Sequence, residues 1–230
     1  MFREAASLIP VGMFLIACPH LAHSDETASS TVGTVSMATG IKITEVTGTT
    51  ATVWTRLTEQ PERNLDGVSF SPTDDALPEG RELRDMIDSA VGAAGQVRLS
   101  YGPSASEERT TIDWTPVNPK SDFTRQFHLQ ELKPGTSYAV QVEGRPLGGT
   151  VATATLRGRF RTPPDENTRA AISFTVVTGQ DYGRRDDVAN GHKIYRHMLS
   201  LDPDFFVHTG DVVYYDKKEP WAKDAQLARY

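Results

Sequence analysis

Two short segments late in the sequence combine glycine, aspartate and tyrosine. They are residues 178–183 (TGQDYG) and residues 210–214 (GDVVY). Carboxylate oxygens are ligands for hard or trivalent cations, and a tyrosine oxygen ligates the haem iron of catalase. If the fold brings the two segments together, Asp181, Asp211 and Tyr214 are candidate ligands of one metal site.

Each segment follows an apolar, β-branched run that is typical of a strand buried on both faces. These runs are residues 172–177 (ISFTVV) and 205–209 (FFVHT), and residues 188–201 between them have apolar side chains spaced i,i+4, which predicts a helix with one apolar face. This order predicts a βαβ unit with parallel strands and a right-handed crossover. Because ligands gather beyond the carboxyl ends of parallel strands, we expect both segments at one edge of the sheet.

Other interpretations of these residues stay open from the sequence. An aspartate after a strand can be a turn former or the N-cap of the next helix rather than a ligand. Arg184 and Arg185, in the first segment's loop, could contact a phosphate or be solvated loop charges. We expect His208, inside the second strand, to be a core or interface residue rather than a metal ligand.

The first two thirds of the chain has a different pattern, with short alternating segments separated by turn residues. This pattern predicts an all-β sandwich. Strands are expected at residues 41–46, 51–57, 97–101, 110–114, 123–129, 138–142 and 156–161. Residues 132–140 (LKPGTSYAV) resemble the tyrosine corner of fibronectin type III domains, so Tyr138 is expected to be structural.

An insertion interrupts the sandwich at about residues 60–95. Within it, residues 81–90 (RELRDMIDSA) predict a short helix with Leu83, Met86 and Ile87 on one face. The insertion could lie over a neighbouring domain or be a surface excursion, which is the interpretation the sequence favours.

The N-terminal segment has an apolar run at residues 5–17, after Arg3. The run is too short to span a bilayer but fits the hydrophobic part of a secretory signal. Residues 22–24 (AHS) fit a cleavage site, while Cys18 fits a bacterial lipobox and a lipid anchor; an apolar helix of a cytosolic protein is the alternative to export. We expect an exported protein, periplasmic or extracellular, or an outer-membrane lipoprotein.

The composition limits the choice of partners. A net charge of −6 and a pI near 5.5 give no nucleic-acid-binding footprint. An anionic substrate would need a local positive centre, such as a bound metal. The single cysteine excludes a disulfide within the chain.

Residues 202–214 (DPDFFVHTGDVVY) resemble the "dPDf-h-GDxxY" motif of PhoD-like alkaline phosphatases, which are calcineurin-like metallophosphoesterases. Residues 53–57 (VWTRL) resemble a strand of that family's N-terminal sandwich. The resemblance implies ferric iron and calcium, with other divalent metals as alternatives, and hydrolysis of small phosphate mono- and diesters by a metal-bound hydroxide. It also implies that Asp211 and Tyr214 bind metal.

The resemblance implies a multidomain β plus α/β chain. The expected parts are a signal peptide (1–24), a linker (25–37), a fibronectin type III-like sandwich (38–162) with the insertion at about 60–95, a second linker (163–169), and the start of a metallophosphoesterase α/β sandwich (170–230).

The first loop departs from the family pattern. The family commonly has Ser-Cys-Gln where this chain has residues 178–180 (TGQ), so Gly179 replaces a cysteine ligand. Asp181 is the obvious substitute, and a carboxylate in place of a thiolate makes the site harder. Asp211 and Arg185 are the candidate catalytic residues.

A complete site of this superfamily also has an Asn/Asp-His motif and later histidines, and none follows before Tyr230. We therefore expect a piece of a longer gene product or a truncated copy, without substantial phosphatase activity by itself. The alternative function is a non-catalytic module whose sandwich binds a surface glycan or another partner, with a degenerate phosphatase remnant attached.

Overall fold

The computed structural model describes residues 33–69, 77–181, 184–187, 189–212 and 214. The predicted signal peptide, Cys18 and Tyr182 lie outside these residues, as do residues 215–230. In the described part of the chain, no helix has both the length and the apolar character needed to cross a membrane.

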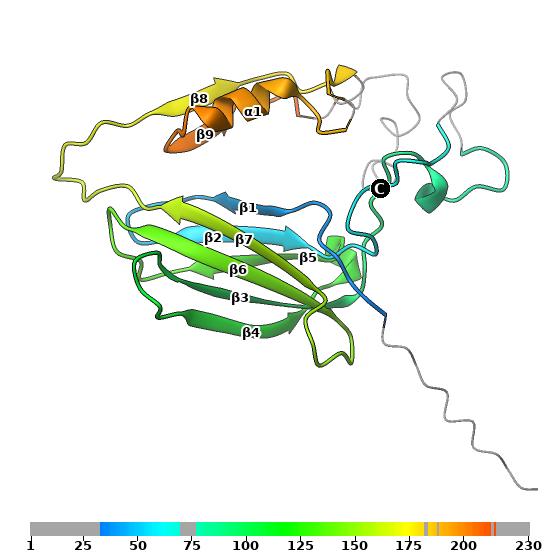
Figure 1. Cartoon of the computed structure of the whole chain (residues 1–230), viewed down its shortest axis with the longest axis horizontal. Helices are drawn as coiled ribbons and strands as arrows, with labels where there is room; N and C mark the ends of the chain where they lie inside the picture. Colours follow the sequence, from blue (N-terminus) through cyan, green and yellow to red (C-terminus); the bar gives the residue numbers. More distant parts are fainter. Residues whose placement is uncertain (1–32, 70–76, 182–183, 188, 213, 215–230) are drawn as a thin grey trace, which may run out of the picture. The chain divides into compact units, whose positions relative to one another are not determined.

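Seven strands form two antiparallel sheets (Figure 1). The strands are β1 (Ile41–Thr44), β2 (Ala51–Arg56), β3 (Gly95–Pro103), β4 (Thr110–Pro116), β5 (Thr124–Leu129), β6 (Ser137–Pro146) and β7 (Ala154–Arg161). One sheet has the order β1-β2-β5 and the other β4-β3-β6-β7. All seven expected strands are present, and β3, β4, β6 and β7 are longer than the sequence predicted.

The core lies between the two sheets and contains the inward-facing side chain of every second residue. Val53 on β2 and Phe127 on β5 are buried from one side, and Leu99 on β3 and Val142 on β6 from the other. Because side chains of a strand alternate between its faces, this burial follows directly from the alternating sequence.

The predicted tyrosine corner is confirmed. The Tyr138 hydroxyl accepts a hydrogen bond from the backbone N–H of Lys133 at 2.8 Å. The ring is buried and stacks on Phe160 with 5.3 Å between the ring centroids. Tyr138 is therefore a structural residue of the sandwich.

The insertion between β2 and β3 differs from the expectation. The predicted helix over residues 81–90 is wrong, because only a single 3₁₀ turn forms, η1 (Leu83–Asp85). After this turn the backbone is extended at Met86, and the N–H of Ile87 donates to the carbonyl of Val68 at 2.9 Å. Burial of Met86 and pairing with the other arm of the insertion outweigh the local helix propensity.

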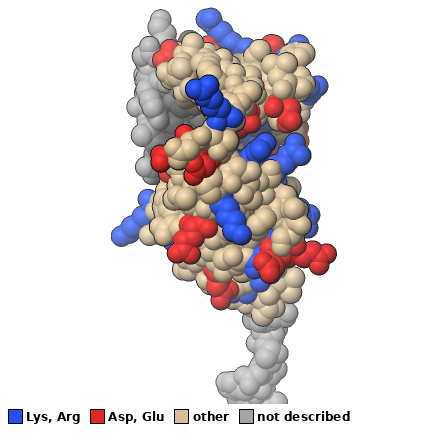
Figure 2. All heavy atoms as spheres, turned by 90° about the vertical axis from the view of Figure 1, so that its left-hand side faces the viewer, with Lys and Arg blue, Asp and Glu red and all other residues tan. Residues whose placement is uncertain are grey.

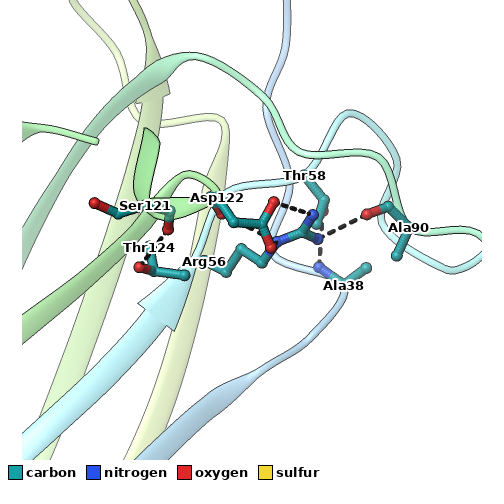
Figure 3. Close-up of polar contacts among 7 residues, drawn as sticks. All are labelled: Ala38, Arg56, Thr58, Ala90, Ser121, Asp122 and Thr124. Atoms are coloured by element: carbon teal, nitrogen blue, oxygen red, sulfur yellow. Dashed lines mark hydrogen bonds and ion pairs between the residues drawn. The ribbon is translucent and has the colours of Figure 1, made fainter. Parts of the chain in front are cut away.

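A buried arginine connects the insertion to the sandwich (Figure 3). Arg56, at the end of β2, donates through Nε and Nη2 to the carboxylate of Asp122, at 2.9 Å each. Asp122 follows the 3₁₀ turn η2 (Pro119–Ser121). The Nη1 of Arg56 donates to the carbonyl of Ala90 at 2.7 Å, so the same guanidinium group holds the last part of the insertion.

The C-terminal part contains β8 (Phe174–Val177), α1 (Lys193–Ser200) and β9 (Phe205–His208). The two strands are parallel, with Phe174 paired with Phe205, so the predicted strand-helix-strand order and direction are confirmed. The larger α/β sandwich expected around them stays a prediction.

The expected burial of these strands on both faces is wrong for the described chain. The side chains of Phe174, Val176, Phe205 and Phe206 are about half exposed, between 47% and 56%. Two strands and one helix have too little surface to cover both faces of a sheet. Met198 is the buried residue of α1.

Candidate metal site at the end of β8 and β9

The two predicted loops lie side by side at the carboxyl ends of β8 and β9. The N–H of Gly179 donates to the carbonyl of Gly210 at 3.2 Å, and the N–H of Gln180 donates to the carbonyl of Asp211 at 2.8 Å. Backbone pairing between the two loops therefore continues beyond the ends of the strands. This is the edge at which the sequence placed the two segments.

The backbone turns sharply at three positions of these loops. Gly179 has φ 70°, Gly210 has φ 129° and Asp211 has φ 58°. Glycine reaches these conformations without a Cβ penalty, and aspartate is among the side chains that tolerate them. A Cβ at Gly179 would lie 3.6 Å from the hydroxyl of Tyr214, so position 179 borders this tyrosine.

Asp211 and Tyr214 are the predicted site residues that the structure brings into contact. The Tyr214 hydroxyl donates to Oδ2 of Asp211 at 3.3 Å. Two oxygens that bind one calcium ion at right angles, with bonds of about 2.4 Å, would be about 3.4 Å apart. The spacing of this pair therefore fits two ligands of one cation.

Asp181 has a different neighbour. Its carboxylate forms an ion pair with Nε of Arg184 at 3.4 Å, and its carbonyl accepts from the N–H of Arg184 at 3.0 Å. The described residues contain no group of three or more His, Cys, Asp or Glu arranged to hold a metal. Asp181 as a third ligand thus stays a prediction.

Arg185 is held by a residue that the sequence analysis did not select. Its Nη2 lies 2.9 Å from Oδ2 of Asp88, in the insertion, and its side chain is 13% exposed. Asp88 also pairs with Arg63, with 2.7 Å between Oδ1 and Nε. From the sequence, the one weak signal for this contact was that the insertion could lie over a neighbouring domain. The structure shows the contact as a partly buried ion pair between Arg185 and Asp88.

Helix α1 contacts the first loop through a further tyrosine. The hydroxyl of Tyr195 donates to Oε1 of Gln180 at 2.5 Å. Burial raises the pKa of Tyr195, so the hydroxyl keeps its proton as a donor at neutral pH. The sequence placed Tyr195 on the apolar face of the helix and did not predict this bond.

His208 lies directly before the second loop. Its Nδ1 accepts a hydrogen bond from the N–H of Gly210 at 3.2 Å. Its Nε2 is buried and has no hydrogen-bond partner among the described residues. This arrangement fits the expected structural role of His208, which shapes the backbone of the glycine before Asp211.

An aspartate directly before β9 is expected to make the pairing of β8 and β9 sensitive to pH. Oδ2 of Asp204 accepts from the backbone N–H of Ser173 at 2.9 Å and from its hydroxyl at 3.2 Å. The backbone hydrogen bond, followed by the hydroxyl bond, lowers the pKa of Asp204 below its ordinary value of 3.8. A lowered pKa in the folded state means that the stabilisation is present above pH 3.8 and is lost as the pH falls through the lower, folded value.

We therefore expect amide exchange in β8 and β9 to accelerate below about pH 3.8 relative to the sandwich strands, once the exchange chemistry is corrected for pH. Asp204→Asn should remove most of this extra acceleration. Asp165→Asn, an exposed aspartate in the segment after β7, is the control and should leave it unchanged. The same acid response in Asp204→Asn would contradict the assignment.

Charges of both signs are interspersed on the face drawn in Figure 2, without one large basic patch. This distribution agrees with the acidic composition of the chain.

Comparisons with known proteins give a likeness of fold. No family model and no curated protein matches the chain. A solved structure titled "Structure of PhoD" aligns with a TM-score of 0.54 and 15% identity, covering 84% of this chain and 35% of that one. The chain thus spans about a third of the length of that structure. The chain has a PhoD-like fold by this measure.

Fibronectin type III domains are also among the structural neighbours. A two-domain segment of chicken tenascin aligns with a TM-score of 0.33 and 18% identity, covering 57% of this chain and 50% of that one. The sixth fibronectin type III domain of the human fibronectin type III domain containing protein 3 has a TM-score of 0.35 and 14% identity, covering 62% and 98%.

Proposed function

We propose that the chain is the N-terminal part of an exported metal-dependent phosphoesterase of the PhoD type, which hydrolyses small phosphate mono- or diesters. The observation that carries the proposal is the pairing of Asp211 with Tyr214, 3.3 Å apart, beside Gly179 and Gln180 at the end of two parallel strands. The PhoD-like fold supports it. Export is proposed from the apolar N-terminal segment alone.

The proposed ligands are Asp211 and Tyr214 from the second loop and Asp181 from the first. A phenolate with carboxylates suits ferric iron and hard divalent cations such as calcium. When bound, such ions activate water and neutralise the charge of a phosphate. Gly179 has no side chain to bind a metal at the position where the family has cysteine. The proposed ligands therefore all bind through oxygen.

Two arginines are proposed to act near the bound substrate. Arg185 would contact a phosphate oxygen through its planar guanidinium group, which matches phosphate geometry. Its pair with Asp88 limits the orientations of the side chain. Arg184, which pairs with Asp181, would have to release that carboxylate when Asp181 binds a cation.

The test is a ferric iron titration of the purified chain, followed by the visible absorption that arises when a phenolate binds ferric iron. We expect this band in the wild type, no band in Tyr214→Phe, and at least about a tenfold weaker affinity in Asp211→Asn, since a missing metal ligand costs more than a missing outer partner.

Tyr195→Phe is the matched control, because Tyr195 bonds Gln180 and is not a proposed ligand. It should keep the band. A band that survives in Tyr214→Phe, or that fails to form in the folded wild type, would overturn the assignment of the iron site.

A further inference from the structure

We propose that Asp88, in the insertion between β2 and β3, is a positioning residue that fixes the loop after β8. The consequence for the phosphoesterase site rests on the proposed function, because that loop carries Asp181 and Arg185. The contact itself is independent of any metal or substrate. The insertion would then be part of the apparatus that shapes the site.

Three side chains and one carbonyl form the contact, which we call the Asp88 clamp. Oδ1 of Asp88 pairs with Nε of Arg63 at 2.7 Å, and Oδ2 pairs with Nη2 of Arg185 at 2.9 Å. The Nη2 of Arg63 donates to the carbonyl of Ala189 at 3.0 Å. The loop is therefore held at two points, Arg185 and Ala189.

The side chains of the clamp are partly buried. Relative exposure is 26% for the side chain of Arg63, 18% for that of Asp88 and 13% for that of Arg185. Ion pairs between fully exposed side chains contribute little, because water screens them and the side chains lose entropy. Short, charge-assisted hydrogen bonds at reduced exposure are stronger and more directional.

The insertion holds Asp88 in a defined place. Its backbone is left-handed, with φ 65°, and its N–H donates to the carbonyl of Asn64 at 2.7 Å. Two residues later, the carbonyl of Ala90 accepts from Arg56 at 2.7 Å (Figure 3). The carboxylate is thus connected to β2 through a short run of backbone.

On the other side, the clamped loop leads directly into α1. Oδ1 of Asp186 accepts from the N–H of Lys193 at 2.9 Å, which satisfies a backbone donor at the helix start. The carbonyl of Asp187 accepts from the N–H of Gly191 at 2.7 Å. Fixing Arg185 and Ala189 therefore also fixes the segment that starts the helix.

The experiment measures amide hydrogen exchange of the full chain without added metal or substrate. In Asp88→Asn we expect the amides of Gly191 and Lys193 to exchange about tenfold faster, because local opening no longer breaks the clamp. Exchange in β6 should not change. Asp66→Asn, an exposed aspartate of the same insertion, is the matched control and should leave both amides as in the wild type.

Arg185→Gln tests the same contact from the loop side, without altering the insertion. We expect a similar acceleration, and the double variant with Asp88→Asn should show less than the product of the two single effects, because both remove one interaction. If Asp88→Asn unfolds the insertion, the amide of Ile87 will lose its protection from exchange. In that case the Arg185→Gln variant alone decides whether the clamp fixes the loop.

Unchanged exchange at Gly191 and Lys193 in Arg185→Gln, or fully multiplicative effects in the double variant, would overturn the proposal. An equal acceleration in Asp66→Asn would do the same. Since no metal is present, these outcomes are separate from the iron titration. Failure of the metal assignment would leave the clamp standing, and failure of the clamp would leave the metal assignment standing.

Discussion

Asp122→Asn is expected to lower the free energy of unfolding by about 3 kcal/mol, because it leaves the buried guanidinium of Arg56 without a counter-charge. The side chain of Arg56 is 5% exposed, and it makes two 2.9 Å bonds to the Asp122 carboxylate. Asparagine keeps the size of the side chain and tolerates the left-handed backbone at this position, where φ is 53°. The measurement is urea unfolding monitored by tryptophan fluorescence.

Glu143→Gln is the control, since it removes the carboxylate of another arginine pair in the same sandwich. Glu143 lies 2.6 Å from Arg98, whose side chain is 37% exposed. Glu143 is itself 13% exposed, but water can reach the guanidinium group of Arg98 that the variant leaves behind, so the loss should be smaller, about 1 kcal/mol. Equal losses in the two variants would show that burial of Arg56 does not determine the stability of the fold.

Phe127→Ala is expected to cost about 3–5 kcal/mol of unfolding free energy, through lost apolar burial and the cavity that remains. Phe127 is 2% exposed and is the largest fully buried side chain among the described residues. It pairs with Val53 on β2, and it faces the core shared by both sheets. Since a domain is stable by about 5–15 kcal/mol, this loss would remove most of the stability of a domain near the lower end of that range.

The control for Phe127 is Leu147→Ala, in the turn after β6. Leu147 is 58% exposed, so its truncation should change the unfolding free energy by no more than about 0.5 kcal/mol. Both variants can be followed by thermal and urea unfolding. A loss below about 1 kcal/mol in Phe127→Ala would contradict the position of the core.

The sandwich was predictable because its signals are local. Alternation in residues 51–57 and 123–129 identified β2 and β5, although Thr52 and Arg56, on the outer face of β2, are buried as well. Tyr138 was predicted as a corner residue from its distance to the preceding Pro-Gly turn, and the bond to Lys133 confirms it. The same holds for β8, α1 and β9, whose order determined that the strands are parallel.

Contacts between distant segments were not predictable from local pattern. The apolar spacing of Leu83, Met86 and Ile87 fits a helix, but Ile87 pairs with Val68 instead. The pairing of Asp88 with Arg185 joins residues almost a hundred positions apart, and no periodicity in the sequence reports it. The exposed faces of β8 and β9 were also missed, because burial depends on which other elements are present to cover them.

Within the candidate site, the sequence predicted the loop positions better than the side-chain contacts. The hydroxyl of Tyr214 is hydrogen-bonded to Asp211, and their shared role as metal ligands stays a prediction. Asp181 pairs with Arg184, whose guanidinium group lies beside the carboxylate. Glycine at position 179 fits the left-handed backbone there, with φ 70°, as expected for a sharp turn after the strand.

The insertion connects β2 to β3, which belong to different sheets, so its length does not alter the register of either sheet. Each doubling of the length of a flexible loop costs only about 0.6 kcal/mol of closure entropy. The sandwich can therefore tolerate changes in the length of this segment at little cost to its own folding. The sequence of this segment is therefore restricted by the residues that hold Asp88 in place. It is not restricted by the number of residues between them.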